Sequence, residues 1–154
     1  MAEPVLERVA DAPKTARGVG FADVEAGDSI PSLVVPPVSR LQLALFAGAA
    51  ADPNPIHVDD EAARAGGLPG VIVHGMLTMA LLGRALTQWV PQRQLRTFSA
   101  RFVAMAFPGD TITASGRITA KSVCDGENRV DVELFATNQR GERLLQGVAT
   151  VALP

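Results

Sequence analysis

The sequence is poor in the residues that several classes of protein depend on. Its 154 residues include one cysteine, two histidines and no tyrosine. A lone cysteine, Cys124, cannot form an internal disulfide, which is typical of chains from a reducing compartment. Two separated histidines without a cysteine cluster do not make a zinc site, so we expect no metal.

Aromatic rings and positive charge are also scarce. Aromatic residues make up 5% of the chain and the formal net charge is −2. The chain therefore has few rings that could stack on bases and no surplus of cations that could bind phosphates, and we expect no nucleic-acid partner. Neither a glycine-rich phosphate loop nor a Gly-x-Ser-x-Gly elbow occurs. We expect no nucleotide cofactor, indeed no cofactor at all, and no serine nucleophile.

The most apolar stretch, residues 71–90, has about the length of a membrane span. It nevertheless contains His74, Arg84 and Gln88, which favour a helix buried inside a protein. No apolar run follows the first methionine, which argues against a signal peptide. These features predict a cytoplasmic protein that does not insert into a membrane.

The remaining composition is that of one globular domain. Hydrophobic residues make up 47% and charged residues 19% of the chain, and the length suits one core but not two. Residues 1–20 have no periodic apolar pattern, so we predict a loose N-terminal arm followed by a single domain over residues 21–154.

Helices are predicted in the first half of the chain. Ser39 is a suitable N-cap for a helix over residues 40–48, which the Asp-Pro-Asn-Pro segment should end. A short helix is expected over residues 59–65. Within residues 71–90 the apolar side chains cover nearly every face, which predicts a long helix surrounded by protein.

Strands dominate the second half. After a short strand over residues 33–35, the predicted strands cover residues 97–107, 111–122, 129–137 and 144–153. The third of these five places Ile112, Ala114, Gly116, Ile118 and Ala120 on one face, and the fourth does the same with Val130, Val132, Leu134 and Ala136. Short turn signals join the last four strands, so we expect an antiparallel meander. The fold class is α+β, with the sheet curled around the long helix.

Six residues, Asp52-Pro-Asn-Pro-Ile-His57, carry the strongest chemical signal, and we call them the Asp–His strap. Its two prolines stiffen the segment and prevent a helix. A carboxylate and an imidazole directed at one water molecule form a general acid–base pair. The alternative is that Asp52 and His57 only cap or brace a turn.

A second candidate is His74-Gly75, at the expected start of the long helix. Free N–H groups at a helix N-terminus bind an oxyanion, and glycine lets a carbonyl approach the backbone closely. Thr78 lies one turn further, on the same stripe as His74. The alternative is that Gly75 only permits close packing and that His74 is a hydrogen-bonded core histidine.

At these residues the sequence resembles the MaoC-like dehydratase family, also called the R-specific enoyl-CoA hydratase or hydratase 2 family. The resemblance rests on residues 46–60, on Gly70-Val-Ile-Val-His-Gly-Met-Leu-Thr78 and on Phe107-Pro-Gly-Asp110. It implies a hot-dog fold, usually dimeric, with an active site at the interface and an acyl tunnel. The implied substrates are trans-2-enoyl and (R)-3-hydroxyacyl thioesters of coenzyme A or acyl carrier protein.

The resemblance also implies roles for single residues. Asp52 and His57 would activate water, the N–H of Gly75 would polarise the thioester carbonyl, and Asn54 would brace the strap or the water site. Two positions depart from the family pattern. Ala51 replaces the usual Gly or Glu, and Gly83 stands where some members have a serine that bonds the aspartate. Thr78 is a possible substitute for that serine.

These observations lead to a hydro-lyase that needs no cofactor. We expect replacement of Asp52 or His57 to lower the turnover strongly and to leave folding largely intact, because a strap of this kind should lie at the surface. Two alternatives are a hot-dog thioesterase and a subunit that pairs with a different hot-dog chain and mainly shapes the acyl tunnel.

Overall fold

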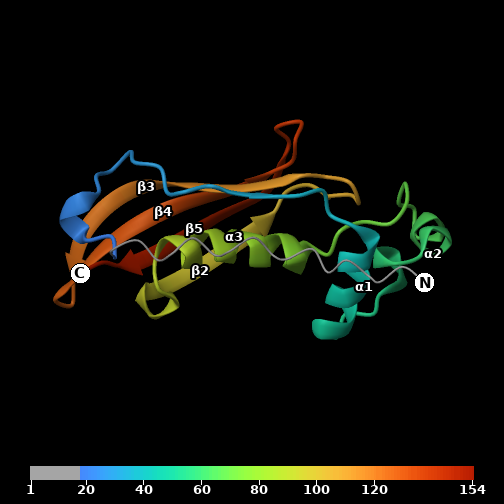
Figure 1. Cartoon of the computed structure of the whole chain (residues 1–154), viewed down its shortest axis with the longest axis horizontal. Helices are drawn as coiled ribbons and strands as arrows, with labels where there is room; N and C mark the ends of the chain where they lie inside the picture. Colours follow the sequence, from blue (N-terminus) through green and yellow to red (C-terminus); the bar gives the residue numbers. More distant parts are fainter. Residues whose placement is uncertain (1–17) are drawn as a thin grey trace, which may run out of the picture.

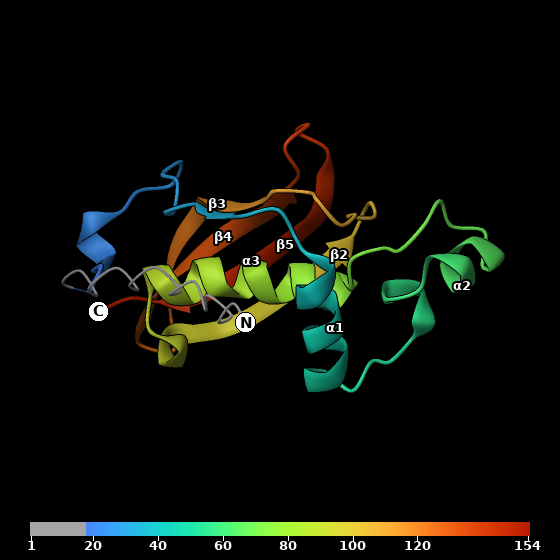
Figure 2. The same cartoon turned by 45° about the vertical axis from the view of Figure 1, so that its right-hand side comes forward.

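A five-stranded antiparallel sheet forms the body of the protein, of which the computed structural model describes residues 18–154. The strands lie in the order β1-β3-β4-β5-β2 and curl around one long helix, α3 (Figures 1 and 2). This arrangement confirms the predicted α+β hot-dog fold. The strands are β1 (Leu33–Val35), β2 (Leu95–Phe102), β3 (Ile112–Cys124), β4 (Glu127–Thr137) and β5 (Arg143–Ala152).

The helices lie on the concave side of the sheet and beyond one end of it. Helix α3 packs against all five strands, whereas α1 and α2 lie past its N-terminal end (Figure 1). The α-helices are α1 (Arg40–Ala49), α2 (Asp60–Ala65) and α3 (Gly75–Trp89), and three 3₁₀ turns are η1 (Phe21–Asp23), η2 (Pro55–His57) and η3 (Gln92–Gln94).

The predicted four-stranded meander is wrong in one connection. β3, β4 and β5 pair in sequence order, but β2 pairs with β5 and so occupies the far edge from β3. Strand β2 ends at Phe102, not at residue 107. The chain then crosses to β3 through a loop in which the Asp110 carboxylate accepts the Phe107 N–H at 2.9 Å. Local turn signals could not distinguish this crossing from a hairpin.

Alternation along the strands predicts the core well, with one exception. All four apolar positions proposed for β4, and those of β3 as far as Ile118, are buried. Ala120, by contrast, is exposed. The register against β4 shifts between Ile118 and Ala120, and such a bulge rotates the following side chains away from the expected face.

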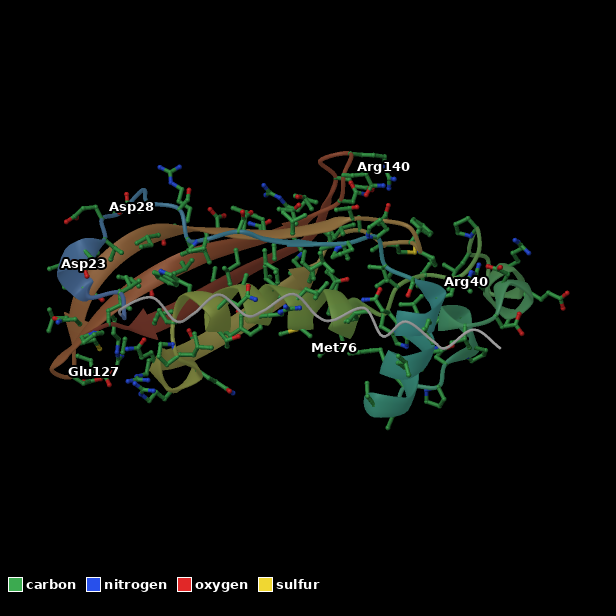
Figure 3. The ribbon with its side chains drawn as sticks, viewed as in Figure 1. Asp23, Asp28, Arg40, Met76, Glu127 and Arg140 are labelled. Atoms are coloured by element: carbon green, nitrogen blue, oxygen red, sulfur yellow. The ribbon has the colours of Figure 1, made fainter. Side chains whose placement is uncertain are left out.

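The long helix is shorter and less enclosed than predicted. It begins at Gly75 because the preceding residues are extended, with the Val73 N–H bonded to the Ala106 carbonyl at 2.8 Å. One face, including Leu82 and Leu86, is buried against the sheet. The opposite face is exposed, as Met76 is in Figure 3. The expectation of a helix covered on every face is therefore wrong for the single chain.

Both ends of the described chain meet at the opposite end of the sheet from α1. The Phe21 N–H bonds the carbonyl oxygen of Pro154 at 2.8 Å. The predicted loose arm, residues 1–20, lies outside the described residues except for its last three. Within residues 18–154, every helix is too short or too polar to cross a bilayer.

Candidate active site

The C-terminal end of α1 positions Asp52 at the site. The Asp52 N–H bonds the Ala47 carbonyl at 3.0 Å, and the Ala51 N–H approaches the Gly48 carbonyl at 3.4 Å. This pair of bonds is a Schellman motif, in which the residue after the C-cap of the helix adopts the left-handed conformation. Ala51 takes that conformation, with φ of 51°. The helix thus ends before the prolines, and the Asp52 backbone is held by the helix that precedes it.

The rest of the strap is braced by its own turn and by α2. The Asn54 side-chain oxygen accepts the Ile56 N–H at 3.2 Å, so Asn54 caps the turn η2, and its exposed side chain is not part of the cavity lined by His57 and Gly75. Asp60, in α2, accepts bonds from Arg40 of α1 at 2.7 Å and from the Val71 N–H at 2.9 Å. These contacts tie both sides of the site together, with Arg40 visible in Figure 3.

His57 ends the strap and is buried, with 8% of its surface exposed. Its Nδ1 lies 2.9 Å from the carbonyl oxygen of Ile72. Because a carbonyl oxygen only accepts, Nδ1 carries the proton and Nε2 keeps a free lone pair. This is the tautomer that a general base requires. The burial also contradicts the expectation that both strap residues lie at the surface, so replacing His57 has a cost in packing.

His74 lies beneath His57 and not on a cavity wall. Only 1% of its surface is exposed, and the two imidazole rings stack with centroids 3.8 Å apart. Its Nε2 lies 3.4 Å from the Asp52 carbonyl oxygen. Burial, followed by the neighbouring His57, lowers the pKa of His74, against the opposing effect of Asp52. His74 is therefore a hydrogen-bonded, neutral core histidine.

The Asp52 carboxylate and the two imidazoles form a tight cluster. One polar atom of each lies within 4.8 Å of the others, a separation that one water molecule can bridge with ordinary hydrogen bonds. The stacked rings do not suit a shared metal ion, because such an ion lies close to the plane of each imidazole, about 2.1 Å from its nitrogen. The ring planes of His57 and His74 are inclined by only 23° with centroids 3.8 Å apart. They therefore do not intersect at a point that close to both nitrogens. The geometry favours water.

An apolar cavity of about 180 Å³ opens beside this cluster. His57, Gly75 and Thr78, three of the residues proposed from the sequence, line it. Asp52, Asn54 and His74 do not. The remaining wall comes from the segment before α3, the end of β2 with its following loop, and the start of β5; its members are Ile72, Val73, Phe102, Ala104, Met105, Ala106, Leu144 and Leu145.

Gly75 is the first residue of α3, so its N–H and that of Met76 have no acceptor within the helix. Together with the positive end of the helix dipole they can stabilise a developing oxyanion. The ring of Phe102 lies directly over Gly75. A Cβ added to Gly75 would come within 2.8 Å of Cε1 of Phe102. Phe102, the last residue of β2, therefore belongs to the site and lines its cavity.

Gly83, which stands where some members of the family have a serine, does not face Asp52. A Cβ at Gly83 would contact Phe98 at 3.4 Å. Within residues 18–154, neither Thr78 nor any other side chain forms a hydrogen bond with the Asp52 carboxylate. Asp52 is instead held through its backbone, by the Ala47 carbonyl and by His74.

The fold and the cluster define a hot-dog domain that carries a carboxylate and two imidazoles beside an apolar cavity. The profile of the family described as MaoC like domain matches residues 25–140, and the chain belongs to this family. The resemblance found in the sequence is thereby confirmed.

Named relatives are hydratases and fatty acid synthases. The (R)-specific enoyl-CoA hydratase of Rhodospirillum rubrum is 29% identical over 136 residues, which cover 87% of this chain and 91% of that protein. The fatty acid synthase subunit beta of Aspergillus oryzae is 39% identical over 115 residues, 72% of this chain. The chain spans only 6% of the length of that subunit.

Solved structures agree with the fold. The unliganded R-hydratase PhaJ1 from Pseudomonas aeruginosa superposes with a TM-score of 0.77 at 26% identity, covering 89% of this chain and 86% of that one.

Proposed function

We propose that this protein is a hydro-lyase that adds water to trans-2-enoyl thioesters to give (R)-3-hydroxyacyl thioesters, and catalyses the reverse dehydration. The observation that carries the proposal is the free Nε2 of His57, in the required tautomer, at an apolar cavity whose wall also holds the N-terminus of α3. The named hydratase relative supports the same chemistry.

In the proposed reaction, the Asp52 carboxylate and His57 hold one water molecule. Nε2 of His57 takes a proton from it, and the hydroxide oxygen bonds to the β-carbon of the enoyl group. Negative charge then moves to the thioester oxygen, where the N–H of Gly75 stabilises it. A proton returned to the α-carbon completes the addition of water. No electron leaves the substrate, so the reaction calls for no redox cofactor.

The acyl carrier is either coenzyme A or an acyl carrier protein. The hydratase relative is named for a coenzyme A substrate, whereas the other relative is part of a fatty acid synthase. Both use the same thioester group, which is the part that Gly75 would contact. A cytoplasmic location, where such thioesters are made and consumed, fits this activity.

We also propose that the protein works as a dimer, either with itself or with another hot-dog chain. Several large apolar side chains around the site are exposed in the single chain: Leu41, Leu45, Met76, Phe102, Val103 and Met105. The outer side of β2 is also without a strand partner in the described part of the chain. A second domain that covers this surface would close the cavity into a tunnel.

The test is hydration of enoyl-CoAs of increasing length, followed by loss of the enoyl absorbance. Asp52→Asn and His57→Gln should each lower kcat about 100-fold or more, because acid–base groups contribute on that scale. Glu61→Gln is the matched control, since Glu61 is an exposed carboxylate on the neighbouring α2 and should leave kcat unchanged. A wild-type dimer that hydrates no enoyl thioester, or full activity of Asp52→Asn and His57→Gln, would refute the proposal.

A further inference from the structure

We infer that His74 is a positioning residue of this active site, joining the Asp52 end of the strap to the Gly75 end of α3 and supporting the ring of His57. The inference rests on the proposed function and gives His74 a role other than contact with the substrate.

The first argument is its place between the two halves of the site. His74 is the N-cap residue of α3, so its backbone directly precedes the N–H of Gly75. Its side chain reaches the carbonyl of Asp52, 22 residues earlier in the chain. One residue therefore spans from the water-activating pair to the oxyanion donor, and its geometry sets the distance between them.

The second argument is the stack with His57. The two rings lie 3.8 Å apart and are inclined by 23°, while Phe46 of α1 packs its ring edge-on against His74 at 5.0 Å. His57 is thus confined by a ring on one face and by the Ile72 carbonyl at Nδ1. These two restraints leave its Nε2 with one direction, which general-base catalysis requires.

The third argument is the tautomer of His74. The Asp52 carbonyl can only accept, so Nε2 of His74 carries the proton. Its Nδ1 is buried and has no hydrogen-bond partner. A second proton there would be an unpaired buried charge against the ring of His57, so His74 itself does not exchange protons with the substrate. Because His74 stays neutral, His57 is the imidazole that takes up the proton from water.

Two substitutions separate the hydrogen bond from the ring. His74→Gln keeps a side-chain N–H that can reach the Asp52 carbonyl, and His74→Phe keeps an aromatic ring but has no donor. The hydrogen bond is long at 3.4 Å, yet it joins the Asp52 end of the strap to the N-cap residue of α3. We expect kcat of His74→Phe to fall about 100-fold, the effect of a misplacement on the order of 1 Å. KM should stay within about threefold, because His74 does not line the cavity, and His74→Gln should recover at least tenfold of the lost kcat.

The matched control is Val90→Ala, at the C-terminal end of the same helix. Val90 is buried to 2% exposure, so this variant should lose stability like the His74 variants while its kcat stays that of the wild type. Equal kcat in His74→Gln and His74→Phe, or a change confined to KM, would overturn the inference. Failure of the wild type to hydrate any enoyl thioester would instead count against the proposed function.

A measurement on the wild type does not depend on how the variants fold. The chain has only two histidines, so nitrogen NMR of the imidazoles, with any tag removed, resolves both. We expect His74 as the neutral Nε2–H form and His57 as the Nδ1–H form. Observation of His74 as the Nδ1–H tautomer would overturn the inference, because its bond to Asp52 would then be absent.

Discussion

Ala51 determines the direction in which the chain leaves α1 for the active site. A left-handed conformation costs an alanine roughly 1 kcal/mol or more, because its Cβ crowds the following carbonyl. Ala51 nevertheless adopts it at φ 51°, directly before Asp52. The strain persists because the Schellman bonds and the following prolines together define the turn, and strain of this kind is common next to functional residues.

Replacement of this residue should therefore stabilise the protein. We expect Ala51→Gly to raise the free energy of unfolding by about 1 kcal/mol, since glycine takes the left-handed conformation without a steric cost. Urea denaturation of the two proteins measures the difference.

Ala44→Gly is the matched control for Ala51→Gly. Ala44 is an exposed residue in the middle of the same helix, so glycine there should lower stability by about 1 kcal/mol. If both substitutions destabilise equally, the left-handed conformation of Ala51 is not what limits stability.

At the scale of single residues, the sequence predicted which residues lie near one another better than how each is buried. Asp52, His57 and Gly75 were proposed from residue type and spacing, and two of the three line the cavity. The burial of His57 and its stack on His74 could not be found, because they depend on how the strap meets the segment before α3. That contact joins residues from separate elements and leaves no periodic pattern.

At the scale of elements, local patterns predicted each strand but not the place of β2. Alternation and turn residues describe the neighbours of a strand along the chain, and β3, β4 and β5 follow that rule. β2 pairs instead with the last strand. The reason is that the curled sheet must close around α3, and burial of a helix is a property of the whole domain.

The start of α3 and the end of β2 form one unit at the site. Adding a Cβ at Gly75 would bring it to 2.8 Å from the Phe102 ring, so the ring would have to move. We expect Gly75→Ala to cost about 1 kcal/mol of stability, as overpacking does. In a Phe102→Ala background the same change should cost nothing, because the obstructing ring is gone. Denaturation of the four proteins of this double-mutant cycle measures the coupling.

Gly83→Ala is the control on the same helix. Its Cβ would make an ordinary contact with Phe98 at 3.4 Å, so alanine should be tolerated or slightly stabilising. Additive effects of the Gly75 and Phe102 substitutions would contradict the contact between the two elements.

At the scale of the whole molecule, exposed apolar side chains lie around the active site. Leu45 on α1 is 66% exposed, and Met76 at the start of α3 is 54% exposed. Exposed apolar side chains gathered near a cavity favour a protein–protein contact. The surface adjoins the free edge of β2, and a second domain placed there would bury both.

The proposed dimer can be tested by charge at this surface. Light scattering after gel filtration should give the wild type twice the mass of the chain, or a single-chain mass if it needs a different hot-dog partner. Leu45→Glu should reduce a homodimer to single chains and lower kcat, because a buried unpaired carboxylate is costly at an interface. Val123→Glu is the control, since Val123 is 70% exposed at the far end of β3 and should not change the mass. A dimer disrupted by Val123→Glu but not by Leu45→Glu would place the contact elsewhere. A fully active single chain would mean that the cavity is complete without a partner.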